Sequence, residues 1–271
     1  MTQLRIAAPK SLAAAPLILM AAEHPGDYEL KFFTDHDHAL ADLTIGTTDI
    51  LCTGYSEMER LPEIGRPQRL ATFVWGLSAL MVCEPGVKNL TDLASLIRKK
   101  SGAALTLPFA GSPLDLEVRA LLRALLPGKD LLIINAPLLQ TFASFQQGKI
   151  TAAVLPEPMA TALEMSGEAF RLADLAELQK QATGRAYSPQ VALFAGQEKN
   201  LPPDFMAQFT ESILRMRLAV AADLKRVADG LAMGQAALER ALSHVIFELP
   251  AAAETKQREK IYAALLSGNL I

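Results

Sequence analysis

The residues best suited to bind a ligand lie in the loop 108–115, between an apolar run and a helical stretch. Ser112 suits a helix N-cap, Pro113 the first helical position, and Asp115 a reciprocal capping role three residues after the serine. A helix start exposes unpaired backbone N–H groups and a partial positive charge, which suit a carboxylate, sulfonate or phosphate without any arginine. Every helix needs a cap, however, whether or not it binds a ligand. The predicted ligand contacts of this loop are Phe109, Gly111 and Ser112.

Hydroxyl groups also follow two other predicted strands. Ser11, with Lys10 before it, comes after the first apolar run, and Pro16 is acceptable only near a helix start. Free backbone N–H groups are therefore expected beyond the end of this strand. Tyr55 and Ser56 follow the third predicted strand and would add a phenol and a hydroxyl. We predict that Lys10, Ser11, Tyr55 and Ser56 contact the ligand.

One carboxylate and one large aromatic ring complete the set of candidate ligand contacts. Glu157 stands between two prolines, after the predicted strand 151–155. Its carboxylate has two interpretations: contact with a ligand cation or hydroxyl, or a local cap on the helix that follows. Trp75 is the only tryptophan and lies where the chain approaches its second group of strands. A core position and a cleft wall are both compatible with this tryptophan.

The sequence predicts no metal site, no cofactor and no catalytic residue. His36 and His38 form the only histidine pair, and side chains two residues apart on a helix do not face the same ligand. Asp35 and Asp37 beside them suit the first turn of a helix, where the dipole favours negative charge. The chain contains no Gly-x-Ser-x-Gly elbow, no Walker loop and no Gly-x-Gly-x-x-Gly fingerprint.

The composition excludes several classes of protein. A chain of 271 residues makes roughly two domains of ordinary size, or one large one. Apolar residues make up 51% and charged residues 20%, so the chain can bury enough surface to fold. The net charge is −3 and the basic residues are thinly spread, which leaves no electrostatic footprint for a phosphate backbone. No nucleic-acid partner is expected.

No segment is apolar over the length that a membrane span requires. The longest apolar stretches, 12–22 and 73–83, have 11 residues each, against about 20 for a bilayer. Residues 4–8 have the pattern of a short buried strand and not the order of regions found in a signal peptide. Cys52 and Cys83 both lie in apolar runs and are interpreted as buried free thiols.

Predicted strands alternate with predicted helices along most of the chain, which is typical of crossover units and largely parallel sheets. The first group has strands at 4–8, 28–33 and 49–53, with helices at 12–23 and from 35. The second group has strands at 104–107, 131–135 and 151–155, with helices at 90–100, 113–126, 137–147 and 172–182. Further predictions are two strands within 70–83 joined by a bend at Gly76, a returning strand at 190–195, and helices at 205–220, 231–247 and 252–266.

These elements predict an α/β protein with two lobes. Residues 1–82 and 188–271 are expected to form the first lobe, and residues 83–187 the second. Each lobe is expected to contain a mixed, mostly parallel sheet flanked by helices, and the chain to end in a helical tail. Loops at the carboxyl edge of such sheets bind small molecules, which is where the candidate residues fall.

Three short segments carry a resemblance to a known family. Residues 14–23, the strand and turn 49–54, and above all 152–161 resemble the substrate-binding proteins of nitrate, sulfonate, taurine and thiamine-precursor ABC transporters. The likeness runs from about residue 4 to 220. Each motif is short, so the match is specific for the superfamily and weak for the substrate.

The resemblance implies a type II periplasmic-binding-protein fold and a solute receptor of an ABC-type uptake system. Such a receptor would capture a small anionic molecule between its lobes by hinge closure, dock on a membrane permease and act as a monomer. A neutral or cationic ligand is the alternative, since Glu157, Asp35 and Tyr55 could also select for an amine. The receptor would be periplasmic or otherwise extracytoplasmic, with a leader trimmed from this sequence or absent from it; a cytoplasmic location is the alternative. The alternative functions are a ligand-sensing module and a cytoplasmic enzyme on the same fold, which would use Lys10 or Glu157.

Overall fold

The computed structural model describes residues 3–55, 57, 66–108, 110–185, 191–196 and 201–268. The chain divides into two units, one made of Met1–Trp75 and Pro189–Thr255, the other of Gly76–Ser188 and Lys256–Ile271.

The C-terminal helix α11 (Ala252–Ser267) contributes residues to both units. The division expected from the sequence keeps the whole tail in the first lobe, whereas residues from Lys256 onward group with the second unit. The physical reason is burial: Leu265 is 1% exposed in the hydrophobic core of the second unit, and Leu266 packs against the same core.

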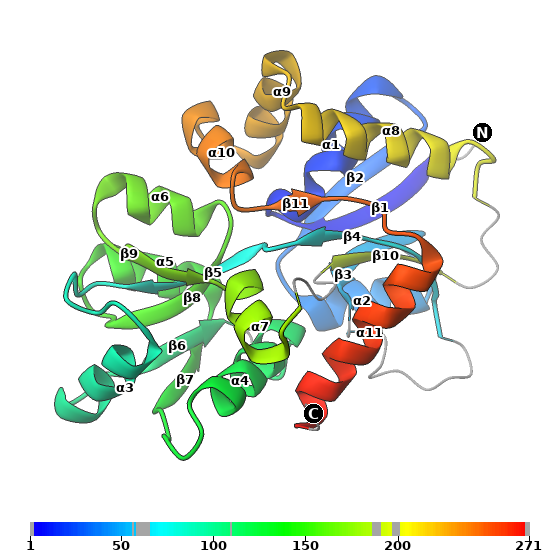
Figure 1. Cartoon of the computed structure of the whole chain (residues 1–271). Coiled ribbons are helices and arrows are strands. Elements are labelled where there is room, and N and C mark those ends of the chain that lie inside the picture. Colours follow the sequence, from blue (N-terminus) through cyan, green and yellow to red (C-terminus); the bar gives the residue numbers. More distant parts are fainter. Residues whose placement is uncertain are drawn as a thin grey trace. The chain divides into compact units, whose positions relative to one another are not determined.

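The first unit is built on a six-stranded mixed sheet over the described residues, with the order β11-β4-β10-β3-β1-β2 (Figure 1). Its strands are β1 (Leu4–Pro9), β2 (Tyr28–Phe33), β3 (Ile50–Gly54), β4 (Gln68–Trp75), β10 (Val191–Ala195) and β11 (Ile246–Phe247). β1 pairs in parallel with β2 and β3, while β10 runs antiparallel to β3 and β4. β3 and β10 are almost wholly buried, as expected for strands covered on both faces.

Helices cover both faces of this sheet. Its helical elements are η1 (Leu12–Ala14), α1 (Ala15–Glu23), α2 (His36–Thr44), α8 (Phe205–Leu218), α9 (Ala221–Leu231) and α10 (Gln235–Leu242). On one face, Ala39 and Leu43 of α2 pack against Ala7 and Leu51. On the other face, the ring of Phe209 in α8 lies edge-on to Phe73 with 5.0 Å between centroids, and α1 packs against α8 and α9.

The second unit has a five-stranded mixed sheet over the described residues, with the order β7-β6-β8-β5-β9. Its strands are β5 (Ser78–Val82), β6 (Leu105–Pro108), β7 (Ile133–Ala136), β8 (Ala152–Pro156) and β9 (Phe170–Asp174). Its helices besides the end of α11 are α3 (Leu90–Lys99), α4 (Pro113–Leu125), α5 (Leu138–Gln146), α6 (Met159–Ser166) and α7 (Leu175–Thr183).

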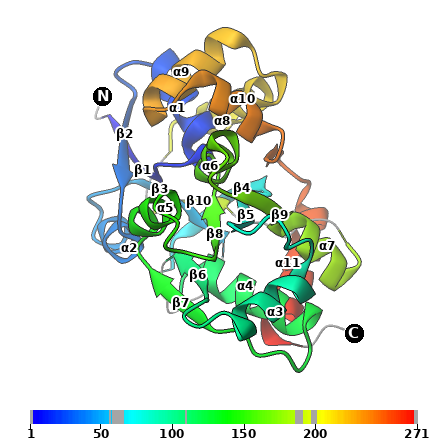
Figure 2. The same ribbon diagram turned by 90° about the vertical axis from the view of Figure 1, so that its left-hand side faces the viewer.

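Alternate residues of the central strands face two different cores in this unit. Leu80 and Val154 pack with helices α3, α4, α7 and α11 on one face of the sheet. Met81 and Leu155, one residue further along, pack with α5 and α6 on the other (Figure 2). Successive side chains of a pleated strand point to opposite faces of the sheet. Because each face has its own core, these strands need apolar residues at every position.

The bend predicted within 70–83 is confirmed. β4 ends at Trp75, β5 begins at Ser78, and Gly76 between them has a φ of +70°, a backbone region that favours glycine. Among the described helices, none combines the length and the apolar character needed to cross a bilayer.

Candidate functional site

Three parallel strands end at one edge of the first unit's sheet. β1, β2 and β3 run in the same direction, so the loops that follow them emerge at the same edge. Lys10 and Ser11 follow β1, and Tyr55 follows β3. The structure therefore brings these three candidate residues to one edge of the sheet. Ser56, the fourth candidate of this group, lies outside the described residues.

Ser11 is buried and caps a helix start, as the sequence predicts. Its Oγ accepts a hydrogen bond from the backbone N–H of Ala13 at 3.3 Å. η1 runs directly into α1, and Pro16 lies in the first turn of α1. Lys10, beside the cap, is exposed to solvent. This loop therefore presents a charged side chain and the start of a helix at the carboxyl edge.

The end of β3 brings a phenol, a hydroxyl and an imidazole to the same edge. The Tyr55 side chain is buried, and the guanidinium of Arg69 lies 5.1 Å from its ring centroid. Nδ1 of His36, at the start of α2, lies 3.0 Å from Oγ1 of Thr53 in β3. The sequence analysis missed this contact because the two residues are 17 positions apart.

Residues 35–38, which contain His36, His38 and two aspartates, form the start of α2. Asp35 is the N-cap of α2, and its carboxylate accepts a hydrogen bond from the backbone N–H of His38 at 2.8 Å. This hydrogen bond is the main cause that lowers the pKa of Asp35 below its ordinary value. The first-turn interpretation of these residues is confirmed.

Trp75 occupies a core position. Its side chain is fully buried at the end of β4, and its indole N–H donates a hydrogen bond to the Glu248 carboxylate. The backbone N–H of Glu248 in turn donates to the carbonyl of Phe73 at 3.1 Å. Trp75 therefore ties the segment after β11 to β4, which is the core alternative that the sequence analysis left open.

Three parallel strands also end at one edge of the second unit's sheet. β6 pairs in parallel with β7 and with β8. Gly111 and Ser112 lie in the loop after β6, and Glu157 follows β8 directly. These candidates therefore share the carboxyl edge of the second sheet, while Phe109 lies outside the described residues.

The start of α4 has the predicted serine cap, but the Asp115 carboxylate bonds a different backbone N–H from the one expected. Ser112 is the N-cap, and its Oγ accepts from the N–H of Asp115 at 3.3 Å, with Pro113 in the first turn. The Asp115 carboxylate reaches back to the N–H of Gly111 at 2.9 Å, one residue before the cap. Gly111 has a φ of +71°, where other residues are strained, so the loop needs this glycine.

A hydrogen-bond network around the buried Asp115 carboxylate holds the loop before α4 in place. Oδ1 of Asp115 accepts from Nε of Arg119 at 2.8 Å and from Nδ2 of Asn135 at 3.1 Å. Arg119 and Asn135 also contact each other, from Nη2 to Oδ1 at 3.1 Å. The sequence analysis missed both partners. The spacing of Asp115 and Arg119, four residues apart on a helix, and a polar residue at the end of an apolar strand were the available signals.

Glu157 is fully buried and its carboxylate is engaged within the second unit. Its Oε1 lies 2.5 Å from Nη2 of Arg171, and its Oε2 accepts from the N–H of Thr161 at 3.2 Å. The second bond is the local helix-start role that the sequence analysis gave as one alternative. Burial alone would lower the pKa of Arg171, but the charges of Glu157 and Asp174 raise it above the ordinary value.

The arrangement supplies hydrogen-bond donors and positive dipole ends to a ligand. At each carboxyl edge a serine-capped helix start stands beside side chains that stabilise its loop. Such groups bind an anion without a counter-charge in the first contact shell. Among the described residues, no three His, Cys, Asp or Glu side chains are grouped to hold a metal ion.

No family model and no curated protein sequence matches the chain. Solved structures do match it. An ABC transporter protein from Parabacteroides distasonis is 18% identical with a TM-score of 0.74, over 99% of this chain and 93% of its own. The alkanesulfonate-binding protein SsuA from Xanthomonas axonopodis pv. citri, bound to MOPS, is 19% identical with a TM-score of 0.68, over 100% and 95%.

The periplasmic nitrate-binding protein NrtA from Synechocystis is 16% identical with a TM-score of 0.66, over 89% of this chain and 70% of its own. Likeness at such identities establishes the fold. The α/β type II periplasmic-binding-protein fold expected from the sequence is therefore confirmed.

Proposed function

We propose that the protein is the solute-binding receptor of an ABC-type uptake system and that its ligand is a small anion of the sulfonate or nitrate type. The observation that carries the proposal is the serine-capped start of α4 at the carboxyl edge of its sheet. The likeness to a sulfonate-binding protein over 100% of the chain and to a nitrate-binding protein over 89% of it supports the proposal. Capture by hinge closure, a permease as partner, an extracytoplasmic location and a monomeric state belong to the same proposal.

The proposed ligand contacts are the candidate residues of the loops that follow β1, β3 and β6. These are Lys10, Ser11, Tyr55, Ser56, Phe109, Gly111 and Ser112. Glu157 and Trp75 have a different role in this proposal, because the polar atoms of their side chains are already bound to Arg171 and Glu248. We propose that these two residues hold the loops in place.

Binding without catalysis is part of the proposal. An enzyme on this fold would need a free titratable group at the carboxyl edges, and the sequence offered Lys10 and Glu157. The ion pair between Glu157 and Arg171 occupies one of them, with Oε1 and Nη2 2.5 Å apart. No observation favours the enzyme or the sensing module over the receptor.

The test is calorimetric titration of the full chain with MOPS, taurine and nitrate, using two capping variants. Ser112→Ala removes a hydroxyl whose hydrogen is available to donate to an anion. Asn89→Ala is the matched control, because Asn89 caps α3 by the same bond, to the N–H of Asp92 at 2.9 Å. α3 follows β5, which is antiparallel to β8 and so ends at the opposite edge.

Both variants are expected to lose about 1 kcal/mol of stability, the usual cost of a lost cap. Only Ser112→Ala should weaken binding of the probe that binds, by about five- to tenfold for one lost hydrogen bond. Equal affinities in the two variants would remove the α4 loop from the site. The absence of saturable binding by every probe would count against the sulfonate or nitrate class.

A further inference from the structure

A groove runs along α4 in the second unit and has no part in the proposed function. Its volume is about 620 Å³, within the range of small-molecule sites of roughly 300–1,000 Å³. Six aliphatic side chains line it: Leu116, Leu122, Leu126, Leu131, Ile133 and Leu266. The lining extends from Leu116 in α4 to Leu126, the C-cap residue of that helix, which is about 15 Å at a rise of 1.5 Å per residue. The groove is thus elongated and mainly aliphatic.

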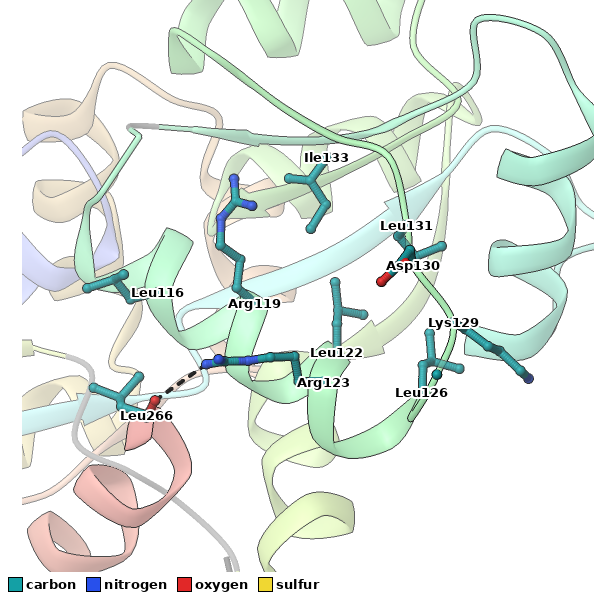
Figure 3. Close-up of a pocket in the computed structure, with 11 residues that line it drawn as sticks. Leu116, Arg119, Leu122, Arg123, Leu126, Lys129, Asp130, Leu131, Ile133 and Leu266 are labelled. Carbon is teal, nitrogen blue, oxygen red and sulfur yellow. Dashed lines mark hydrogen bonds between the residues drawn. The ribbon is translucent and has the colours of Figure 1, made fainter. Parts of the chain in front are cut away.

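Basic side chains also line the groove. Arg119, Arg123 and Lys129 line it together with one acid, Asp130 (Figure 3). Arg119 is already bonded to Asp115 and Asn135. Positive charge therefore exceeds negative charge along an aliphatic floor.

Arg123 is attached to the groove by one long hydrogen bond. Its Nη2 donates to the carbonyl of Leu266 at 3.4 Å, and no carboxylate among the described residues forms an ion pair with it. In Figure 3 its guanidinium extends toward Leu266 at the end of α11. A guanidinium in this position can turn to a bound anion without breaking an ion pair, and it offers bidentate geometry to a carboxylate or sulfate.

We propose that this groove binds a monomeric medium-chain alkyl anion, such as a fatty carboxylate or an alkyl sulfate. The alkyl chain lies along the leucines and Ile133, and the charged head is bound by Arg123. A small hydrated anion would leave the aliphatic floor exposed, and a neutral alkane would leave Arg123 without an anion. The amphiphilic anion is the class that satisfies both parts of the lining.

The experiment is calorimetric titration of the full chain with sodium decanoate below its micelle concentration. Acetate, which has the head without the chain, and decyltrimethylammonium, which has the chain with the opposite charge, are the ligand controls. Because buried methylenes drive binding, octanoate should bind more weakly than decanoate by about two- to fourfold per methylene. Saturable binding of decanoate, with little or none of acetate and decyltrimethylammonium, is the expected result.

Two variants connect this binding to the groove. Arg123→Ala should weaken decanoate binding by about tenfold or more, the loss of a charge-assisted hydrogen-bonded pair. Arg98→Ala is the matched control. Arg98 lies in the last turn of α3, and its one hydrogen bond among the described residues is to the backbone carbonyl of Ala94 at 3.3 Å. Leu116→Asp places a negative charge on a 43% exposed position of the lining and should also weaken binding.

Three outcomes would overturn the proposal. The first is the absence of saturable decanoate binding, and the second is equal affinity in the Arg123→Ala and Arg98→Ala variants. The third is binding to vesicles of anionic phospholipid with none to monomeric decanoate, because it would make the cations of this face a membrane-surface contact. None of these outcomes bears on the binding of MOPS or nitrate, so the failure of this proposal is distinguishable from that of the receptor.

Discussion

Arg171 forms ion pairs with three carboxylates of the second unit, and its side chain is only 9% exposed. Its Nη2 and Nη1 lie 2.5 Å from Glu157 and Asp174, and its Nε lies 3.3 Å from Glu164. Glu157 is the buried member of the group, since it is fully inaccessible while the other two are about a quarter exposed. The cation is therefore required chiefly by one carboxylate, the one that follows β8.

Replacing Arg171 by Met should destabilise the protein by about 3–5 kcal/mol, because Glu157 would remain buried without a counter-charge. Adding Glu157→Gln to this variant should recover much of the loss, since the amide carries no charge. Urea unfolding of the two variants and the wild type measures both effects. A double variant no more stable than Arg171→Met would show that the ion pair is not the source of the cost.

Tyr28 gives the protein a specific sensitivity to alkali. Its phenol donates a hydrogen bond to Gln208, and burial, with the charges of Asp204 and Asp27, raises the pKa of Tyr28 to about 12. Above about pH 10 the unfolded chain releases this proton while the folded chain keeps it. The unfolded state then binds fewer protons, so the stability contributed by Tyr28 is present below pH 10 and is lost as the pH rises toward 12.

Urea unfolding of Tyr28→Phe tests this sign. The variant should be less stable than the wild type at neutral pH, by about 1 kcal/mol for the lost hydrogen bond. The difference in stability should shrink as the pH rises above 10, because only the wild type has a Tyr28 phenol whose raised pKa lowers the stability in this range. A difference that stays constant through this range would contradict the assigned pKa. All other ionisable groups are the same in both proteins, so their contributions cancel in the comparison.

At the scale of elements, local signals were predictable and distant pairings were not. The start of α4 follows from Ser112, Pro113 and Asp115 because a cap involves residues within one turn of each other. Asn135 joins that cap from a strand 20 residues further along, and no local pattern announces it. Residue spacing thus identified the helix start but not the network that holds it.

The same limit explains two missed strands. The sequence analysis extended a helix over 231–247, whereas α10 ends at Leu242 and Ile246–Phe247 form β11. Phe247 is buried opposite Val74 of β4, and this pairing outweighs the local helical preference. β9 was missed for a similar reason, because only its ladder with β5 makes it a strand.

A close helix contact gives a prediction at this scale. A Cβ added to Gly230 of α9 would lie 2.9 Å from Cγ2 and 3.2 Å from Cδ1 of Ile18 in α1. Alanine normally favours a helix over glycine by about 1 kcal/mol, but here overpacking should reverse the sign and cost about 1–3 kcal/mol. Thermal or urea unfolding of Gly230→Ala measures it.

The control uses Ile18→Ala as the background, since it removes both clashing carbon atoms. Gly230→Ala should then be neutral or stabilising relative to Ile18→Ala alone. If the substitution costs the same in both backgrounds, its effect arises from the backbone of α9 and not from the contact with Ile18.

At the scale of the whole molecule, alternating strands and helices predicted an α/β fold, and the type II architecture is confirmed by solved structures over 99–100% of the chain for two of them. The prediction succeeded because buried strands require continuous apolar runs, which are visible in any sequence. The tail was harder. Leu265 of α11 is buried in the core of the second unit. The sequence of a helix at the end of a chain does not indicate which of two cores the helix will join.

The central claim is that this protein binds a small solute and releases it unchanged. The most direct test is native mass spectrometry of the freshly purified full chain, followed by denaturation and identification of any molecule released. The expected result is a stoichiometric small anion, recovered chemically intact. A protein that is empty, and whose thermal unfolding is not shifted by MOPS, taurine, nitrate, thiamine precursors or amino acids, would contradict it.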